Sequence, residues 1–369
     1  MPKTGKNIFK RKDGRWEHRF ISCYEDGKAC YKSVYGKDCS EVKSKMKNNI
    51  PLNIAAAKTT VTDETSMGTV CNQWLESIGI RLKESTVANY YHIINVHIKP
   101  YFRNIGIKQI TNGLLDDFIK QKSTDLSAKT VKKTVLLLFR ILKWADRKIC
   151  FLGLDYDGII LPKQQNKVLS VLEKSEQITL IQYIDENPSN ETLGLLIALF
   201  TGLRISELSA LKWGDIDFDT ASIKVTKSLQ RIQDISPDRK TKTKIIIGTP
   251  KSEKSMRKIP IPSFMLDLLR IRSFGHTSSD YLLTGNSSYM EPRTFQRRYA
   301  GHIKKAGIVY RNFHTIRHTF ATRAVEVGFD LKSLSEILGH SSVKLTLDKY
   351  VHSLDKQKRD CMEKLIEIF

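Results

Sequence analysis

The sequence has no apolar run near the roughly eighteen residues that a membrane-spanning helix requires. Its first residues, MPKTGKNIFKRKDGRW, contain no apolar stretch of the kind found in signal peptides. Cysteines are scarce: the six in the chain form no Cys-x-x-Cys pair and have no histidine partner at zinc-ligand spacing. These absences argue against a membrane protein, a disulfide framework and a structural zinc site, and they predict a soluble protein of the cytoplasm.

Acidic side chains are in deficit. The chain carries 61 Lys and Arg against 39 Asp and Glu, a formal net charge of +22 at pH 7. Residues 1–60 are the most basic part, with 14 basic and 6 acidic side chains. Such an excess favours a polyanionic partner, because neutralising phosphates releases counterions. Nucleic acid is the leading candidate partner, and an anionic membrane surface is the weaker one.

Length and composition predict several folded domains. The chain has 369 residues, of which 40% are hydrophobic, enough for two or three cores. Small and polar residues over 51–66, and Gly, Pro and polar residues over 152–168, read as linkers. We therefore expect three domains, at residues 1–60, 67–155 and 168–369.

The first domain is predicted to be a three-stranded sheet followed by a helix. Short β-prone runs at 7–9, 16–22 and 28–35 are separated by two Asp-Gly turn signals. Residues 40–50 read as a short helix capped by Ser40. A sheet of this size can enter a DNA major groove, although its charge can also simply face solvent. The candidate DNA-binding residues are Arg11, Lys12, Arg15, Trp16, Arg19, Lys28 and Lys32.

The second domain reads as four helices, because apolar residues recur there at three- and four-residue spacing. Ser85 and Ser127 are expected to cap two of these helices, and the aromatic residues are expected to form core. The third domain reads as mixed. Helices are expected at about 175–187 and 191–211, the latter broken at Thr201-Gly202, followed by a β region and further helices.

Five short motifs follow one another in the third domain. Taken singly, each has an ordinary structural explanation, such as a surface arginine or a histidine after a helix-ending glycine. Their occurrence in this order within one domain of a basic protein makes chance less plausible. The motifs are TGLRISELSAL (201–211), TPKSEKSMRKIPI (249–261), HTIRHTFAT (314–322), LGH ending at His340, and TLDKYVH, which places Tyr350 ten residues later.

Together these motifs resemble the tyrosine recombinase family of phage-type integrases. The resemblance implies a multidomain protein. It would have a small β-sheet plus helix that binds arm-type DNA sites, an all-α four-helix core-binding domain of the SAM-like type, and a mixed α+β, mainly helical catalytic domain. Members of this family cut a DNA strand, hold it on a tyrosine through a 3′-phosphotyrosine bond, and rejoin it to another strand. The expected biological outcome is integration and excision of a mobile element.

The resemblance assigns the phosphate-binding groups. Charge that develops on the non-bridging oxygens of the attacked phosphate needs fixed donors, and planar guanidinium forks suit it. Arg204 and Arg317 are the candidate clamps, and His340 is a further phosphate donor. Glu207 is expected to orient Arg204 or His314 from behind.

The remaining roles concern the nucleophile and its protons. Tyr350 would attack the phosphorus, and His314 would assist its deprotonation or orient the phosphate. Lys251, at a turn between strands, would protonate the leaving 5′-oxygen. Lys254 and Lys258 lie near enough in sequence to be mistaken for it, and the insertion at 231–244 lengthens this hairpin.

No cofactor is expected. No motif supplies the clustered carboxylates that hold Mg²⁺, and no G-x-x-x-x-G-K-[ST] loop is present for ATP. The resemblance implies double-stranded DNA, at core and arm sites, as the substrate. It also implies a homotetramer on two duplexes and an excisionase or DNA-bending accessory factor. Residues 352–369 are expected to pack on a neighbouring protomer, with packing on their own domain as the alternative.

Three rival functions remain open. A type IB topoisomerase shares the tyrosine and arginine chemistry but needs no sequence-reading N-terminal sheet. A DNA-binding repressor explains the charge but not the ordered motifs. An invertase or a chromosome-dimer recombinase is the nearest rival, and such proteins usually lack an extra N-terminal arm domain.

Overall fold

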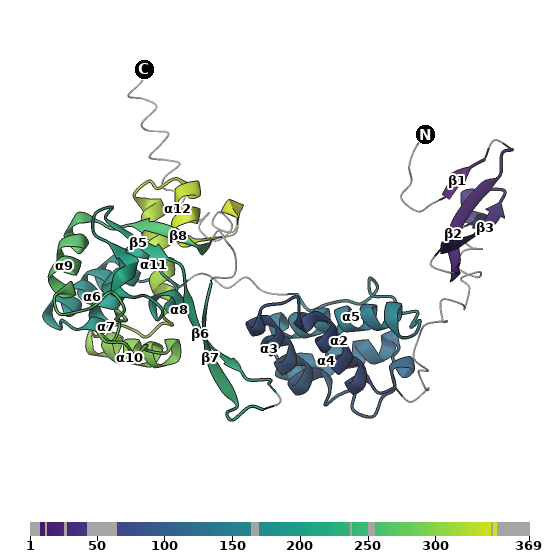
Figure 1. The fold of residues 1–369 in the computed structure, drawn as a ribbon, viewed down its shortest axis with the longest axis horizontal. Coiled ribbons are helices and arrows are strands. Elements are labelled where there is room, and N and C mark those ends of the chain that lie inside the picture. Colours follow the sequence, from purple (N-terminus) through teal and green to yellow (C-terminus); the bar gives the residue numbers. More distant parts are fainter. Residues whose placement is uncertain are drawn as a thin grey trace, which may run out of the picture. The chain divides into compact units, whose positions relative to one another are not determined.

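The computed structural model describes residues 8–11, 13–25, 28–42, 65–163, 170–236, 238–249, 255–340 and 342–344. The chain divides into two compact units, residues 1–83 with 90–163, and residues 84–89 with 164–369. Figure 1 shows the elements along the chain, mostly helices with small sheets. Among the described helices, none is long and apolar enough to cross a membrane.

The N-terminal sheet has the predicted three strands. They are β1 (Ile8–Lys10), β2 (Trp16–Glu25) and β3 (Lys28–Gly36), antiparallel in the order β1-β2-β3. Lys10 pairs with Trp16 and Glu25 pairs with Lys28, so both Asp-Gly signals connect hairpin strands as predicted. The β2–β3 register shifts between Ile21 and Cys23, where the ladder has a bulge.

The helical segment after this sheet begins differently from the prediction. Helical backbone starts at Cys39, and the carboxylate of Asp38 accepts from the backbone N–H groups of Ser40 (2.8 Å) and Glu41 (2.7 Å). Asp38 therefore caps this turn, and the prediction of Ser40 is wrong, because the helix already begins at Cys39 and Ser40 lies within its first turn. Residues 43–64 lie outside the described part of the chain.

The four-helix prediction for the second domain is confirmed. Its core buries the aromatic side chains of Trp74, Phe102, Phe118 and Phe139, as expected. The four helices are α2 (Met67–Gly79), α3 (Glu84–Ile93), α4 (Asn112–Asp125) and α5 (Ala128–Lys148). The π-helical turn η1 (Ile94–Ile98) extends α3, and the short 3₁₀ helix η2 (Ile107–Gln109) precedes α4.

Helix capping in this bundle agrees with the prediction at one of two positions. The Ser127 hydroxyl accepts from the backbone N–H of Thr130 at the start of α5, as predicted. Ser85 is not a cap, because α3 already begins at Glu84 and follows Lys83, which makes no side-chain cap bond. The expected linker at 152–168 also begins too early: Leu152, Ile159 and other apolar residues up to Leu161 pack on the bundle core.

The C-terminal unit contains helices around one small sheet and one hairpin. The sheet consists of β4 (Ile216–Asp217), β5 (Ser222–Val225) and β8 (Arg257–Pro260), in that order, and the hairpin pairs β6 (Ser228–Gln233) with β7 (Thr243–Gly248). The helices are α6 (Lys174–Glu186), α7 (Asn190–Thr201), α8 (Ile205–Leu208), η3 (Trp213–Asp215), α9 (Ser263–Ser273), α10 (Pro292–Lys305), α11 (His314–Glu326) and α12 (Leu331–Leu338). Helix α11 packs against α7 and α12, and α12 also contacts β8.

The break predicted after α7 is present and sharp. Gly202 ends the helix with φ +63°, in the left-handed region that favours glycine. A Cβ atom there would lie 2.6 Å from Cδ1 of Phe320 and 2.9 Å from Cδ2 of Leu338, so no larger residue fits without displacing these side chains of α11 and α12. This tight turn directs the following residues, Leu203 and Arg204, toward the end of α12.

Candidate active site

Three arginines from different elements donate to three consecutive carbonyls at the end of α12. Arg257 Nε lies 2.5 Å from the carbonyl oxygen of Ile337, Arg317 Nη2 lies 2.6 Å from that of Leu338, and Arg204 Nη2 lies 3.1 Å from that of Gly339. The last carbonyls of a helix have no intrahelical partner and carry partial negative charge. The three guanidinium groups satisfy these acceptors and so gather around one turn.

Glu207 holds both the backbone and the side chain of Arg204. Arg204 is the N-cap residue of α8, and its backbone N–H donates to Glu207 Oε2 (3.0 Å) while its Nη1 donates to Glu207 Oε1 (2.6 Å). Its side chain is 32% exposed, which leaves part of the guanidinium open to solvent. The one-turn spacing of the arginine and the glutamate in TGLRISELSAL produces this arrangement, as a capping box does with shorter side chains.

Arg317 lies deeper. It belongs to α11, is 2% exposed, and donates through Nη1 to the carbonyl of Gly202 (2.8 Å) in addition to its bond to Leu338. It therefore ties the turn that precedes Arg204 to the turn that precedes His340. A buried guanidinium needs such acceptors, because leaving its donors unpaired would cost several kcal/mol.

Glu207 is the buried acid beneath the arginines. It is 4% exposed, and its carboxylate receives Arg204 as well as Nη1 (3.2 Å) and Nη2 (2.9 Å) of Arg257. Burial on its own would raise the pKa of Glu207. The hydrogen bonds and charge of Arg257, with the charge of Arg204, outweigh burial and lower that pKa to about 2. Glu207 thus contacts Arg204, one of the two residues that it was expected to orient, and it has Arg257 as a second, unpredicted partner.

Two histidines lie at the edges of this arrangement. His314 begins α11 on its exposed side, its backbone N–H donates to Asn312 Oδ1 (2.9 Å), and its ring packs edge-on to His318 at 4.5 Å. His340 is half-buried and follows Gly339, whose φ of +61° ends α12. The backbone N–H of His340 donates to Ser335 O (3.0 Å), the long bond of a Schellman motif.

The structure thus brings together Arg204, Glu207, Arg317 and the turn that carries His340. Lys251 and Tyr350, the predicted acid and nucleophile, lie outside the described residues. Of the two alternative lysines, Lys254 also lies outside them, and Lys258 is on β8, paired with Lys224 of β5.

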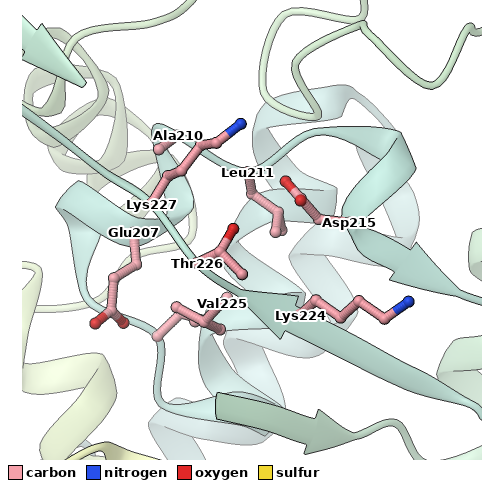
Figure 2. A pocket seen from close by; sticks show the side chains of 9 residues that line it. Glu207, Ala210, Leu211, Asp215, Lys224, Val225, Thr226 and Lys227 are labelled. Atoms are coloured by element: carbon pink, nitrogen blue, oxygen red, sulfur yellow. The ribbon is translucent and has the colours of Figure 1, made fainter. Parts of the chain in front are cut away.

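A small hollow adjoins Glu207 on the side of β5, as Figure 2 shows. Its accessible volume, about 10 Å³, is near the minimum for one water molecule, so it does not accommodate a cofactor. Among the residues that the structure describes, no three His, Cys, Asp or Glu side chains form a potential metal site. The hollow is lined by Leu203, Glu207, Ala210, Leu211, Asp215, Lys224, Val225, Thr226 and Lys227.

The N-terminal candidates are partly engaged by neighbouring acids. Arg11 Nη1 donates to Glu17 Oε2 (3.1 Å), Arg15 forms a two-pronged contact with Asp13, and both guanidinium groups lie 5.6 Å from the centre of the Tyr35 ring. Trp16 is half-buried, and Lys12 and the side chains of Arg19, Lys28 and Lys32 lie outside the described part of the chain.

Sequence reasoning missed two features. One is Arg257, which the motif TPKSEKSMRKIPI contains but which reads as one more basic residue of a hairpin. The other is a basic stripe on α5, visible as cations at helical spacing along a helix whose one acid is the half-buried Asp146. The exposed basic residues of this stripe are Lys129, Lys133, Arg140, Lys143 and Arg147.

Comparison with known proteins finds matches along most of the chain. Residues 170–357, more than half of the chain, match the phage integrase family, and residues 66–134 match the N-terminal SAM-like domain of phage integrases. A XerC-like tyrosine recombinase of Caldanaerobacter subterraneus is 27% identical, covering 94% of each chain. The ICEBs1 integrase of Bacillus subtilis is 25% identical, covering 90% of each chain.

Solved structures show the same fold. The integrase of transposon Tn1549, in complex with transposon right end DNA, matches with a TM-score of 0.64 at 22% identity, covering 80% of this chain and 99% of that one. A lambda integrase dimer bound to a COC′ core site matches with a TM-score of 0.56 at 18% identity, covering 93% and 94%. The chain therefore belongs to the phage integrase family, the tyrosine recombinases, which are DNA strand-transferring enzymes.

Proposed function

We propose that the protein cuts and rejoins DNA strands with Tyr350 as nucleophile, using Arg204, Arg317 and His340 to bind the attacked phosphate. The observation that carries this proposal is the convergence of Arg204 and Arg317 on the adjacent carbonyls of Gly339 and Leu338, directly before His340. Two guanidinium groups from distant parts of the sequence meet at this turn, which precedes Tyr350 by about ten residues in the sequence.

The exposed side of Arg204 is where we place the scissile phosphate. Arg204 is partly open to solvent, whereas Arg317 is buried and fixed to two turns. Arg204 would bind a non-bridging oxygen directly, and Arg317 would supply positive charge from below and hold the turn in place. Preorganised cations act most strongly here because charge develops on these oxygens as the bond forms.

The covalent step conserves the bond energy of the DNA backbone. The Tyr350 phenol loses its proton, assisted by His314, and its oxygen forms a bond to phosphorus. The bond from phosphorus to the 5′-oxygen breaks, and Lys251 gives that oxygen a proton. Attack by a second strand's 5′-hydroxyl on the 3′-phosphotyrosine reverses the sequence, and no metal or ATP is consumed.

DNA binding is assigned to three parts of the chain. The four-helix domain would hold the core site through the basic stripe of α5, since this stripe carries five exposed cations, while the one acid of the helix, Asp146, is half-buried and accepts from the backbone N–H of Leu152. The N-terminal sheet, with Arg11 and Arg15, would bind a separate arm-type site and make the protein bivalent for DNA. The catalytic domain would hold the scissile phosphate at Arg204. The net charge of +22 supports this assignment.

The biological reaction we propose is integration and excision of a mobile element. Relatives include the ICEBs1 integrase and, at 27% identity over half of this chain, a transposase from transposon Tn916. The XerC-like relative favours the alternative, a recombinase that acts outside mobile elements. The N-terminal sheet favours an integrase of a mobile element. A lambda integrase tetramer has been solved on a Holliday junction. We propose the same assembly here, with an excisionase or DNA-bending protein setting direction.

The test is covalent capture. Nicked duplexes tiled across the DNA that flanks the coding sequence are incubated with the full chain in EDTA, and protein–DNA adducts are read on a denaturing gel. Wild type should form an adduct and Tyr350→Phe should not. An adduct with Tyr350→Phe would show that another residue is the nucleophile. DNA binding without any adduct would favour a non-catalytic DNA-binding protein.

A further inference from the structure

We propose that Arg257 is a positioning residue for strand cleavage, linking the Glu207–Arg204 pair to the turn that carries His340. This inference rests on the proposed function. It adds a residue that does not itself contact the phosphate but determines where two phosphate-binding groups lie.

All three guanidinium nitrogens of Arg257 donate hydrogen bonds within the protein. Its side chain is 6% exposed at the first residue of β8. Nε donates to Ile337 O, while Nη1 and Nη2 donate to the two carboxylate oxygens of Glu207, and Nη1 also reaches Ser255 O (3.1 Å). Only a planar fork with donors on three nitrogens can make these bonds together, so lysine cannot replace it.

The contacts of Arg257 connect two separate supports of the site. Through Glu207 it meets the carboxylate that holds both the backbone and the side chain of Arg204. Through Ile337 it holds the last turn of α12. A Cβ atom on Gly339 would lie 3.1 Å from Nη1 and 3.2 Å from Cδ of Arg257, so the turn also rests directly on this side chain.

A contribution to stability does not by itself explain why a buried arginine occupies this position. Buried ion pairs contribute little to stability compared with apolar residues of similar volume, since both charges must be desolvated. An arginine that binds both a carboxylate and a helix end is better explained as a residue that fixes the positions of these two groups. Misplacing a phosphate-binding group by about 1 Å can slow a reaction about 100-fold.

Loss of Arg257 should also change the pH dependence of cleavage. The groups that face Glu207 are Arg204 and Arg257, with Asp215, Lys224 and Lys227 on the same hollow (Figure 2). Without Arg257, burial of Glu207 is opposed mainly by Arg204, so its carboxylate takes up a proton at higher pH. A protonated Glu207 cannot accept from both donor groups of Arg204, and the cleavage rate then falls as pH decreases.

The experiment compares Arg257→Gln and Arg257→Lys with wild type and with the control Arg231→Gln. Arg231 makes the same two-pronged contact with Glu291, but at 44% exposure and away from the arginine cluster. Adduct formation at Tyr350 is measured in single turnover at saturating DNA, from about pH 5 to about pH 8. DNA affinity and thermal unfolding are measured alongside.

Arg257→Gln should slow adduct formation about 10- to 100-fold with little change in DNA affinity, and its rate should fall further toward acid pH. Arg257→Lys keeps the charge but not the fork, so it should be slow without the added acid dependence. Adding Glu207→Gln to Arg257→Gln should remove that dependence, and Arg231→Gln should match wild type.

Wild-type rates and pH profiles in both Arg257 variants would overturn the inference. So would equal slowing at every pH in Arg257→Gln and its double variant, since that pattern indicates a structural role alone. If Arg257→Gln does not fold, Arg257→Lys still tests the inference, since slow adduct formation at unchanged affinity and unchanged thermal unfolding supports it and a wild-type rate overturns it. Failure of wild type to form any adduct would instead count against the proposed function.

Discussion

Arg204 Nη2 lies 3.1 Å from the carbonyl oxygen of Gly339, although the two residues are 135 positions apart in the sequence. The contact joins the start of α8 to the end of α12. It places the more exposed of the two candidate phosphate-binding arginines directly beside His340. Because Arg317 and Arg257 bind the two preceding carbonyls, a disturbance of this one turn is expected to reach all three arginines.

Gly339→Ala should therefore lower both stability and activity. Its φ of +61° disfavours any side chain, at a cost of about 1–2 kcal/mol in the free energy of unfolding. The added methyl group would also press on the Arg257 guanidinium. We expect adduct formation to slow by about 10-fold or more at saturating DNA.

Gly328→Ala is the matched control for that variant. Gly328 also has positive φ, +92°, but nothing lies within 4 Å of the position that its Cβ would take. It should lose comparable stability in urea titrations while cleaving DNA at the wild-type rate. Equal slowing in both variants would mean that general destabilisation, and not the position of the turn, reduces activity.

Glu207 should contribute to stability in a pH-dependent way. Its pKa in the folded protein, about 2, is lower than the ordinary value near 4.5. The contribution is therefore fully present above about pH 4.5 and is lost as pH falls toward about 2, as the carboxylate takes up a proton. Its full size is on the order of 3 kcal/mol.

Urea unfolding of wild type and Glu207→Gln at a series of pH values tests this expectation. At neutral pH, Glu207→Gln should be less stable by about 3 kcal/mol, because two buried or half-buried guanidinium groups lose their counter-charge. The difference should shrink as pH falls below about 4.5. Asp185→Asn, a substitution of an exposed acid in α6, serves as the control. A constant difference at all pH values would show that the carboxylate charge is not what stabilises the cluster.

The basic stripe of α5 should carry core-site binding. Replacing Lys129, Lys133 and Lys143 with Gln in a Tyr350→Phe background should weaken DNA binding and flatten its salt dependence. The slope of log K against log salt should decrease by about 0.9 for each DNA phosphate that the variant no longer neutralises. Lys120→Gln on α4 removes an exposed cation that is paired with Asp117, and it should leave the slope unchanged. An unaltered slope in the triple variant would exclude α5 as the DNA-binding face.

Local signals predicted much of the architecture because they act over a few residues. The Asp-Gly pairs correctly indicated both N-terminal hairpins, and Ser127 correctly indicated the start of α5. Predictions of the same kind were wrong where a neighbour competed: Asp38 takes the capping role expected of Ser40, and α3 begins one residue before Ser85. Such choices depend on small energy differences that residue type alone does not settle.

By itself, the sequence determined the order of the motifs, the helical spacing of the bundle, the excess of positive charge and the break at Gly202. These properties follow from chain chemistry and periodicity. Only the tertiary structure decided that Arg317 is buried, that Glu207 serves two arginines, and that Arg257 joins them. The physical reason is that the arginines are held by the last carbonyls of α12 and by Glu207, which come from separate parts of the sequence. No periodic pattern records which side chains fold back to satisfy those carbonyls.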